Sequence, residues 1–248
     1  MNESGKLKTG SEFADLVAVM AMLRSPQGCP WDREQDHRSL RRCLLEEAYE
    51  VLEAIDRGDP AALCQELGDL LLQVIFHAQL SAEAGEFAID DVIRGLHEKL
   101  VVRHPHVFGG KTIETADAVV DEWESLKREQ RQQTHADQMA DVPQAMPALA
   151  RAQMVLRRAA RTGVARSAEE AEKAVGESAK LAAAGDGAER NVAELLLAAA
   201  DLARIRGVDA EQALRERVTR FVEEFGTRAS SAGADTRGQQ ENRPTEAN

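Results

Sequence analysis

Five acidic residues in two short stretches of the sequence have the types and the spacing of a metal site. They are Glu46, Glu47, Glu50, Glu66 and Asp69. Residues three or four apart share one face of a helix, so each stretch directs carboxylates to one side. Like charges this close repel and raise each other's pKa, and a cation between them offsets that cost. Ligands that are all oxygen favour Mg²⁺, or Mn²⁺ in its place, over Zn²⁺.

Two antiparallel helices are needed to bring the two stretches together. Apolar residues at helical spacing predict helices over 39–57 and 60–84. Between them, Gly58 can end the first helix and Pro60 can open the second. Helices joined by so short a link run antiparallel, so their carboxylates face one another. Two solvated acidic faces are the alternative, but core-type residues surround both stretches and favour the cation site.

Two cations lie one helical turn apart further along the chain. Lys99 and Arg103 share a face of a helix that we expect to reach Arg103. Their repulsion would be offset by an anion bound between them, and a solvated face is the alternative. A later helix over 116–131 carries Trp123 and Lys127 four residues apart, which places an aromatic ring beside a charge.

A loop rich in glycine and proline, GCPWD at 28–32, contains Trp31 and Asp32. A tryptophan in such a loop either covers the core or offers a platform for a flat ligand. From composition alone, we expect Trp31 to cover the core.

The composition indicates helices and argues against several classes of function. The chain has 248 residues, of which 43% are hydrophobic and 4% aromatic, and its formal net charge is −12. This charge argues against binding nucleic acid, which needs clustered lysine and arginine. The three cysteines fit no zinc spacing and predict reduced thiols in a cytoplasmic protein. The sequence shows no apolar signal region and no membrane-spanning run, so we expect no membrane partner.

The chain repeats one apolar pattern, which predicts two helical modules in tandem. Residues 66–80 align with 191–205 and keep the apolar ladder, but glycine, lysine and asparagine stand where three of the five acids would lie. We therefore expect the second copy to be structural. The predicted segments are a flexible N-terminus over 1–12, a first module over 13–131, a linker over 132–147, a second module over 148–227 and a polar, disordered tail over 228–248.

These motifs resemble those of the MazG family of nucleoside triphosphate pyrophosphohydrolases, among the all-α NTP pyrophosphatases. The matching motifs are GCPWDREQ at 28–35, LEEAYEVLEAI at 45–55, ELGDLLLQVIFHAQ at 66–79, KLVVRHPHVFG at 99–109, DEWESLK at 121–127 and PALARAQ at 147–153. The resemblance implies an all-α fold of tandem MazG-type helical modules, each a four-helix-bundle-like unit when two chains dimerise. It also implies Mg²⁺-dependent hydrolysis of NTPs and dNTPs to the monophosphate and pyrophosphate, as housecleaning of the nucleotide pool.

Carried over residue by residue, the resemblance assigns a role to each candidate in the first module, which would be the catalytic one. The metal ligands would be Glu46, Glu47, Glu50, Glu66 and Asp69. Of these, Glu46 or Glu50 would also act as the general base on the attacking water. The substrate-binding residues would be Lys99 and Arg103 at the phosphates, Trp123 and Lys127 near the nucleotide, and Trp31 and Asp32 in the GCPWD motif.

Two other functions stay open at this point. A non-catalytic, nucleotide-binding regulatory dimer would suit a chain whose second module has lost its acids, although the intact acids of the first module argue against it. A di-iron bundle needs two Glu-x-x-His motifs, and the pair Glu34 and His37 is single.

Overall fold

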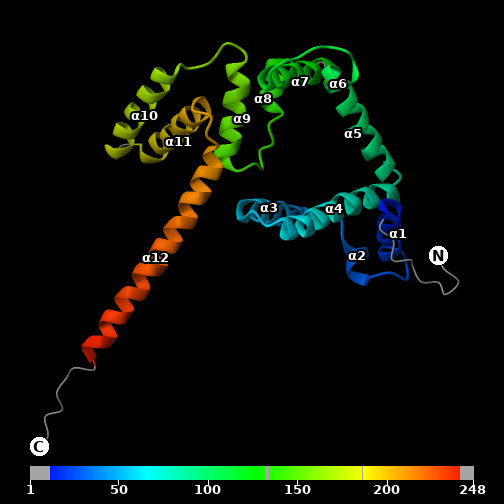
Figure 1. Ribbon diagram of the computed structural model, residues 1–248, viewed down its shortest axis with the longest axis horizontal. Helices are drawn as coiled ribbons and strands as arrows, with labels where there is room; N and C mark the ends of the chain where they lie inside the picture. Colours follow the sequence, from blue (N-terminus) through cyan, green and yellow to red (C-terminus); the bar gives the residue numbers. More distant parts are fainter. Residues whose placement is uncertain (1–11, 132–133, 186, 241–248) are drawn as a thin grey trace, which may run out of the picture. The chain divides into compact units, whose positions relative to one another are not determined.

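The computed structural model describes residues 12–131, 134–185 and 187–240, and all regular structure within them is helical (Figure 1). The predicted all-α fold is confirmed. The chain divides into two compact units, Met1–Trp123 and Glu124–Asn248, which agrees with two modules in tandem. No helix in the described part of the chain is long and apolar enough to cross a membrane.

The first unit contains seven helices among its described residues, and the last of them continues into the second unit. They are α1 (Phe13–Leu23), α2 (Pro30–Glu34), α3 (Arg41–Arg57), α4 (Pro60–Glu83), α5 (Ile89–Arg103), α6 (Pro105–Phe108) and α7 (Ala116–Arg131). Helix α3 begins two residues later than predicted. The reason is local: Asp36 Oδ1 accepts hydrogen bonds from the amides of Arg38 (2.8 Å) and Ser39 (2.7 Å), which holds a turn before the helix.

Helices α3 and α4 form the predicted antiparallel hairpin (Figure 1). Gly58 ends α3 with φ of 63°, a left-handed conformation that favours glycine. Asp59 then caps α4, because its Oδ1 accepts hydrogen bonds from the amides of Ala61 (2.9 Å) and Ala62 (3.1 Å). The turn therefore sets which residues of the two helices face each other.

The core of this unit lies between α1, the start of α3 and the second half of α4. Its buried members are Met20, Leu40, Ile75 and Phe76, with Val17, Leu72 and Leu80 packed against them. This packing holds α4 at its C-terminal half. The acidic stretch of α4 lies nearer its N-terminus, outside this cluster.

Arg24 joins three elements of the first unit. Its guanidinium donates to both carboxylate oxygens of Glu83 (Nη2 to Oε2, 2.8 Å) and to the backbone carbonyls of Asp32 and Gln35. It also lies over the ring of Phe76, 5.4 Å from its centroid. Arg24 therefore ties the segment that carries Trp31 to the end of α4.

We expect Arg24→Leu to lower the free energy of unfolding by about 2 kcal/mol, because the hydrogen bonds to Glu83 are lost and the carbonyls of Asp32 and Gln35 each lose one donor. The Arg24 hydrogen bond, the largest cause, lowers the pKa of Glu83. The ionised Glu83 therefore stabilises the fold at pH values above its unfolded pKa of about 4.5. This stabilisation is lost as the pH falls through the lower pKa that Glu83 has in the folded protein. Urea unfolding at several pH values tests this, with Arg42→Leu, at an exposed arginine, as control.

The second unit contains a second helical hairpin. Its elements after α7 are α8 (His135–Ala140), α9 (Ala148–Ala160), α10 (Ala168–Ala183), α11 (Ala188–Ile205) and α12 (Ala210–Gln240). Helices α10 and α11 pair as α3 and α4 do. Asn191, at the repeat position of Glu66, donates through Nδ2 to the carbonyl of Leu181 (3.1 Å). In this copy the position holds the hairpin together instead of offering a carboxylate.

The structure differs from two predicted segment boundaries. The predicted linker, 132–147, contains α8, whose start is fixed by Thr134: its Oγ1 accepts from the amide of Asp137 (3.2 Å), and Asp137 accepts from the amide of Thr134 (2.8 Å). Helix α12 continues to Gln240, past residue 228, where the polar tail was predicted to begin. Residues 1–11 and 241–248 lie outside the described residues, so the predictions for them remain untested.

Gln153 joins three helices of the second unit. It is buried, its Oε1 accepts from the amide of Ala210 (3.0 Å), and its Nε2 donates to the carbonyls of Val208 (2.8 Å) and Ala200 (3.4 Å). We expect Gln153→Leu to lower the free energy of unfolding by about 1–3 kcal/mol, because the partly buried amide of Ala210 and carbonyl of Val208 lose this partner. Thermal unfolding measures this, and Gln212→Leu, at an exposed glutamine-to-glutamate contact on α12, should change little.

Candidate metal centre

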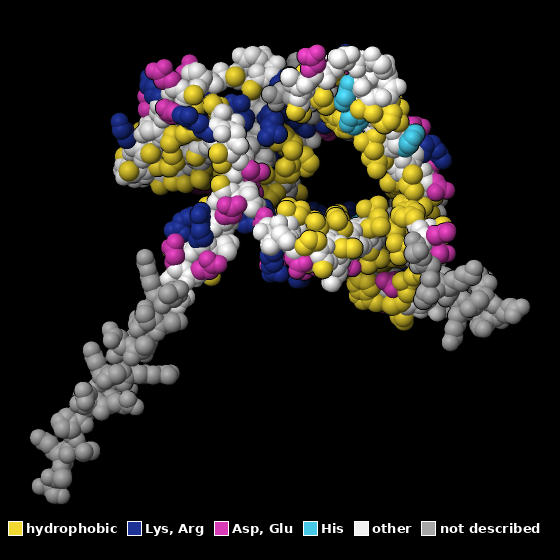
Figure 2. Space-filling view, viewed as in Figure 1, with side chains coloured by type: hydrophobic (Ala, Val, Ile, Leu, Met, Phe, Trp, Pro, Cys, Tyr) yellow, Lys and Arg dark blue, Asp and Glu magenta, His cyan; other side chains and the backbone are white. Residues whose placement is uncertain are grey.

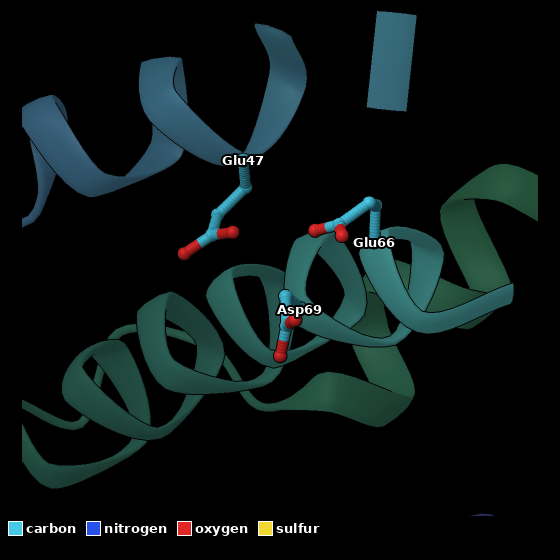
Figure 3. Close-up of side chains that lie close together, drawn as sticks. All are labelled: Glu47, Glu66 and Asp69. Carbon is cyan, nitrogen blue, oxygen red and sulfur yellow. The ribbon is translucent and has the colours of Figure 1, made fainter. Parts of the chain in front are cut away.

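Three carboxylates from the two helices of the first hairpin converge. Glu47 extends from α3 toward Glu66 and Asp69 on α4 (Figure 3). Each offers one oxygen atom, and these three atoms lie within 4.8 Å of one another. All three residues are half-buried. The hairpin turn produces this meeting, since it sets the middle of α3 against the first half of α4.

Negative charge gathers around Glu47 within this group. The pKa of Glu47 is raised, first by burial and then by the charges of Glu50 and Asp69, with Glu66 adding to them. A carboxylate whose neighbours and burial all oppose its charge is stabilised by a proton or by a cation. Oxygen ligands at this spacing fit a hard divalent cation, which is Mg²⁺ or Mn²⁺.

The other two predicted ligands lie beside this group. Glu46 is exposed, and its carboxylate accepts from Arg42 Nε at 2.7 Å, which raises the pKa of Arg42. Glu50 is also exposed, but it is near enough to Glu47 to raise its pKa. The structure thus brings together three of the five predicted ligands. The roles of all five as metal ligands stay predictions.

The predicted phosphate and nucleotide contacts come from other helices. Arg103 ends α5 and is 7% exposed, and its guanidinium lies over the ring of Trp123, 5.4 Å from the centroid. Lys99 is exposed one turn earlier. Lys127 is half-buried on α7 and belongs to the second unit. The structure therefore pairs Arg103 with Trp123. Among the described interactions, neither Lys99 nor Lys127 contacts an aromatic ring in this way.

His104 lies beside Arg103 and Trp123 and was not among the residues predicted from the sequence. Its Nδ1 donates to the carbonyl of Leu100 (2.6 Å) at the end of α5, and its ring meets that of Trp123 edge-on, with centroids 4.8 Å apart. Trp123 therefore contacts both Arg103 and His104. The adjacency of His104 to a candidate cation was the available signal.

Trp31 does not cover the core, so that prediction is wrong. Its side chain is 55% exposed at the start of the short helix α2. Pro30 opens this helix, and Arg24 holds the carbonyl of Asp32, so the backbone is fixed while the ring faces outward. The exposed ring suits the other interpretation, a platform for a flat ligand.

Comparison with known proteins gives the same assignment as the motifs. The family model of the MazG nucleotide pyrophosphohydrolase domain matches residues 35–108, which contain the three converging carboxylates, Lys99 and Arg103. The protein of Thermotoga maritima named nucleoside triphosphate pyrophosphohydrolase/pyrophosphatase MazG is 40% identical over 229 residues, which are 91% of this chain and 86% of that protein. The chain belongs to the MazG family. A second relative, the protein of Escherichia coli K12 named nucleoside triphosphate pyrophosphohydrolase, is 38% identical over 228 residues, which are 85% of this chain and 84% of that protein.

Proposed function

We propose that this MazG-family protein is a nucleoside triphosphate pyrophosphohydrolase that works with Mg²⁺ at Glu47, Glu66 and Asp69. The activity is that named for its relatives of 40% and 38% identity, which match it over most of both chains. The observation that carries the metal site is the convergence of three carboxylate oxygens within 4.8 Å around a glutamate whose pKa is raised.

The reaction needs a nucleophilic water and a way to neutralise the phosphates. A bound Mg²⁺ supplies both Lewis acidity and a lower pKa for water. The water oxygen forms a bond to phosphorus, the anhydride bond to the bridging oxygen breaks, and a carboxylate takes the proton of the water. Of the two predicted bases, Glu50 is the better candidate, because it lies beside Glu47 whereas Glu46 is paired with Arg42.

Arg103 is the proposed anchor of the triphosphate. A guanidinium binds phosphate oxygens through two parallel N–H groups, and contact with an aromatic ring limits its orientations beforehand. Its position over Trp123 provides that restriction. Lys99, one turn earlier and exposed, would add a second positive charge, while Lys127, Trp31 and Asp32 remain proposed contacts of the nucleotide.

A homodimer is the proposed assembly, in which each module would complete a four-helix bundle. Hydrophobic side chains lie exposed on the hairpin of α3 and α4 (Figure 2). A single two-helix layer leaves such faces in water, and a second copy would cover them. Those that are about half exposed are Leu45, Tyr49, Ile55 and Leu67. Light scattering of the purified protein measures its mass and so tests the dimer.

The three free thiols support the proposed cytoplasmic compartment.

Measurement of pyrophosphate release tests the activity. Normal and damaged NTPs and dNTPs are supplied with Mg²⁺ or with EDTA, and the products are separated. We expect equal amounts of monophosphate and pyrophosphate with Mg²⁺ and none with EDTA. Nucleotide binding without any product would contradict the proposal and favour the regulatory dimer. A preference for damaged nucleotides would support the housecleaning role.

A further inference from the structure

Gln73 on α4 contains a buried acceptor that the described part of the protein leaves unpaired. The residue is 5% exposed, and its Oε1 is buried without a hydrogen-bond partner among the described residues. Gln153, a buried glutamine of the second unit, instead uses both ends of its amide. An unpaired buried acceptor costs about 1–3 kcal/mol, so one in a native protein needs an explanation.

The position of Gln73 connects this acceptor with the metal centre. Asp69, Gln73 and His77 follow one another at four-residue steps along one face of α4. Side chains of a helix lean toward its N-terminus, which is the direction of Asp69 from Gln73. On the far side, His77 Nδ1 already meets His37 Nδ1 at 2.8 Å. Along this face of α4, Gln73 therefore stands between the paired His77 and Asp69 of the carboxylate group.

A hydrated cation at the carboxylate group would provide a donor for Gln73 Oε1. Mg²⁺ keeps several waters when a protein binds it, and a water polarised by the cation is a strong hydrogen-bond donor. We propose that Gln73 Oε1 accepts a hydrogen bond from a water of the cation bound by Glu47, Glu66 and Asp69. Gln73 is then a positioning residue of the metal centre. This inference rests on the proposed function, since it requires that cation.

The amide is suited to this place for an electrostatic reason. A carboxylate at residue 73 would add negative charge to a group that already raises the pKa of Glu47. An amide oxygen accepts a hydrogen bond without adding charge and without taking the proton. The water is therefore oriented but stays available to a separate base.

The two possible roles of Gln73 predict opposite effects of Gln73→Leu. If the acceptor serves the cation, the metal-free variant unfolds at the same or a higher temperature, because an unpaired polar atom has been removed. Its affinity for Mn²⁺ falls about 10–100-fold, as when other partners of metal-bound groups are removed. If the amide is structural, the metal-free variant is less stable and its affinity for Mn²⁺ is unchanged.

The experiment uses the full-length protein and Mn²⁺ as the probe. Free Mn²⁺ is followed by electron paramagnetic resonance during titration, and thermal unfolding is recorded in EDTA. Gln79→Leu is the matched control on the same helix: Gln79 Nε2 donates to Glu83 Oε1 (2.9 Å) at an exposed contact, so this variant should change little in stability in EDTA and keep its Mn²⁺ affinity. A second variant, Gln73→Glu, retains an acceptor, and we expect no fall in its Mn²⁺ affinity.

The outcomes separate this inference from the proposed function. Weaker Mn²⁺ binding by Gln73→Leu with undiminished stability in EDTA supports the inference. Wild-type affinity in Gln73→Leu, a loss of its stability or folding in EDTA, or an equal fall in affinity in Gln73→Glu overturns it while the metal centre stands. A wild-type protein that binds no Mn²⁺ overturns both the metal centre and the inference.

Discussion

Glu47→Gln is expected to abolish Mg²⁺-dependent pyrophosphate release while making the metal-free protein more stable. Glu47 is the one carboxylate of α3 among the three that converge. Without its charge, the cation would be held by the two carboxylates of α4 alone. Removing even an indirect partner of a metal weakens binding about 10–100-fold, and a direct ligand should cost more than about 100-fold. Stability in EDTA rises because burial and the charges of Glu50 and Asp69 all oppose the ionised form.

A pair of measurements checks this expectation. Pyrophosphate release is assayed at rising Mg²⁺ concentrations, and thermal unfolding is followed in EDTA. Glu53→Gln is the matched control, since Glu53 is an exposed glutamate of the same helix that pairs with Arg57 one turn on. It should change turnover little and stability by a few tenths of a kcal/mol. Wild-type turnover in Glu47→Gln would remove this residue from the metal centre.

The local signals in the sequence were sufficient for the hairpin that carries the centre. Glycine and proline in the turn determined where α3 ends and α4 begins, and the acidic spacing followed from helical geometry. Spacing along a helix gives the direction of a side chain only approximately, however. Glu46 and Glu47 differ by about 100° around the axis, and that rotation pairs Glu46 with Arg42 instead of the metal group.

The features that could not be predicted from the sequence depend on contacts between residues far apart in the chain. Arg24 and Glu83 are 59 positions apart, and only the fold brings them together. The carbonyl of Asp32, next to the exposed Trp31, is held by the same Arg24, a contact that spacing along the chain does not predict. The sequence likewise does not show that Gln73 Oε1 has no hydrogen-bond partner among the described residues, because there Gln73 resembles any polar member of an amphipathic helix.

Arg103→Lys is expected to raise the KM for nucleoside triphosphates about tenfold or more while leaving Mn²⁺ affinity unchanged. The substitution keeps the positive charge but loses the planar group that lies over Trp123 and could grip two phosphate oxygens. Hydrogen bonds to charged groups contribute about 1.5–3 kcal/mol, and losing one of them accounts for a change of this size. Arg94→Lys, at an exposed arginine of α5 that pairs with Asp91 (2.9 Å), is the control.

The role of Trp123 can be separated from that of Arg103 by a double-mutant cycle. If the ring acts by holding the guanidinium, Trp123→Leu raises the KM by itself but adds little to Arg103→Lys, because the contact is already lost. If the ring stacks on the base, the two effects add, and those of Trp123→Leu depend on which base is offered. Contact of Trp123 with both Arg103 and His104 favours the first result. Additive effects that depend on the base would show that Trp123 contacts the nucleotide, as the family resemblance implies.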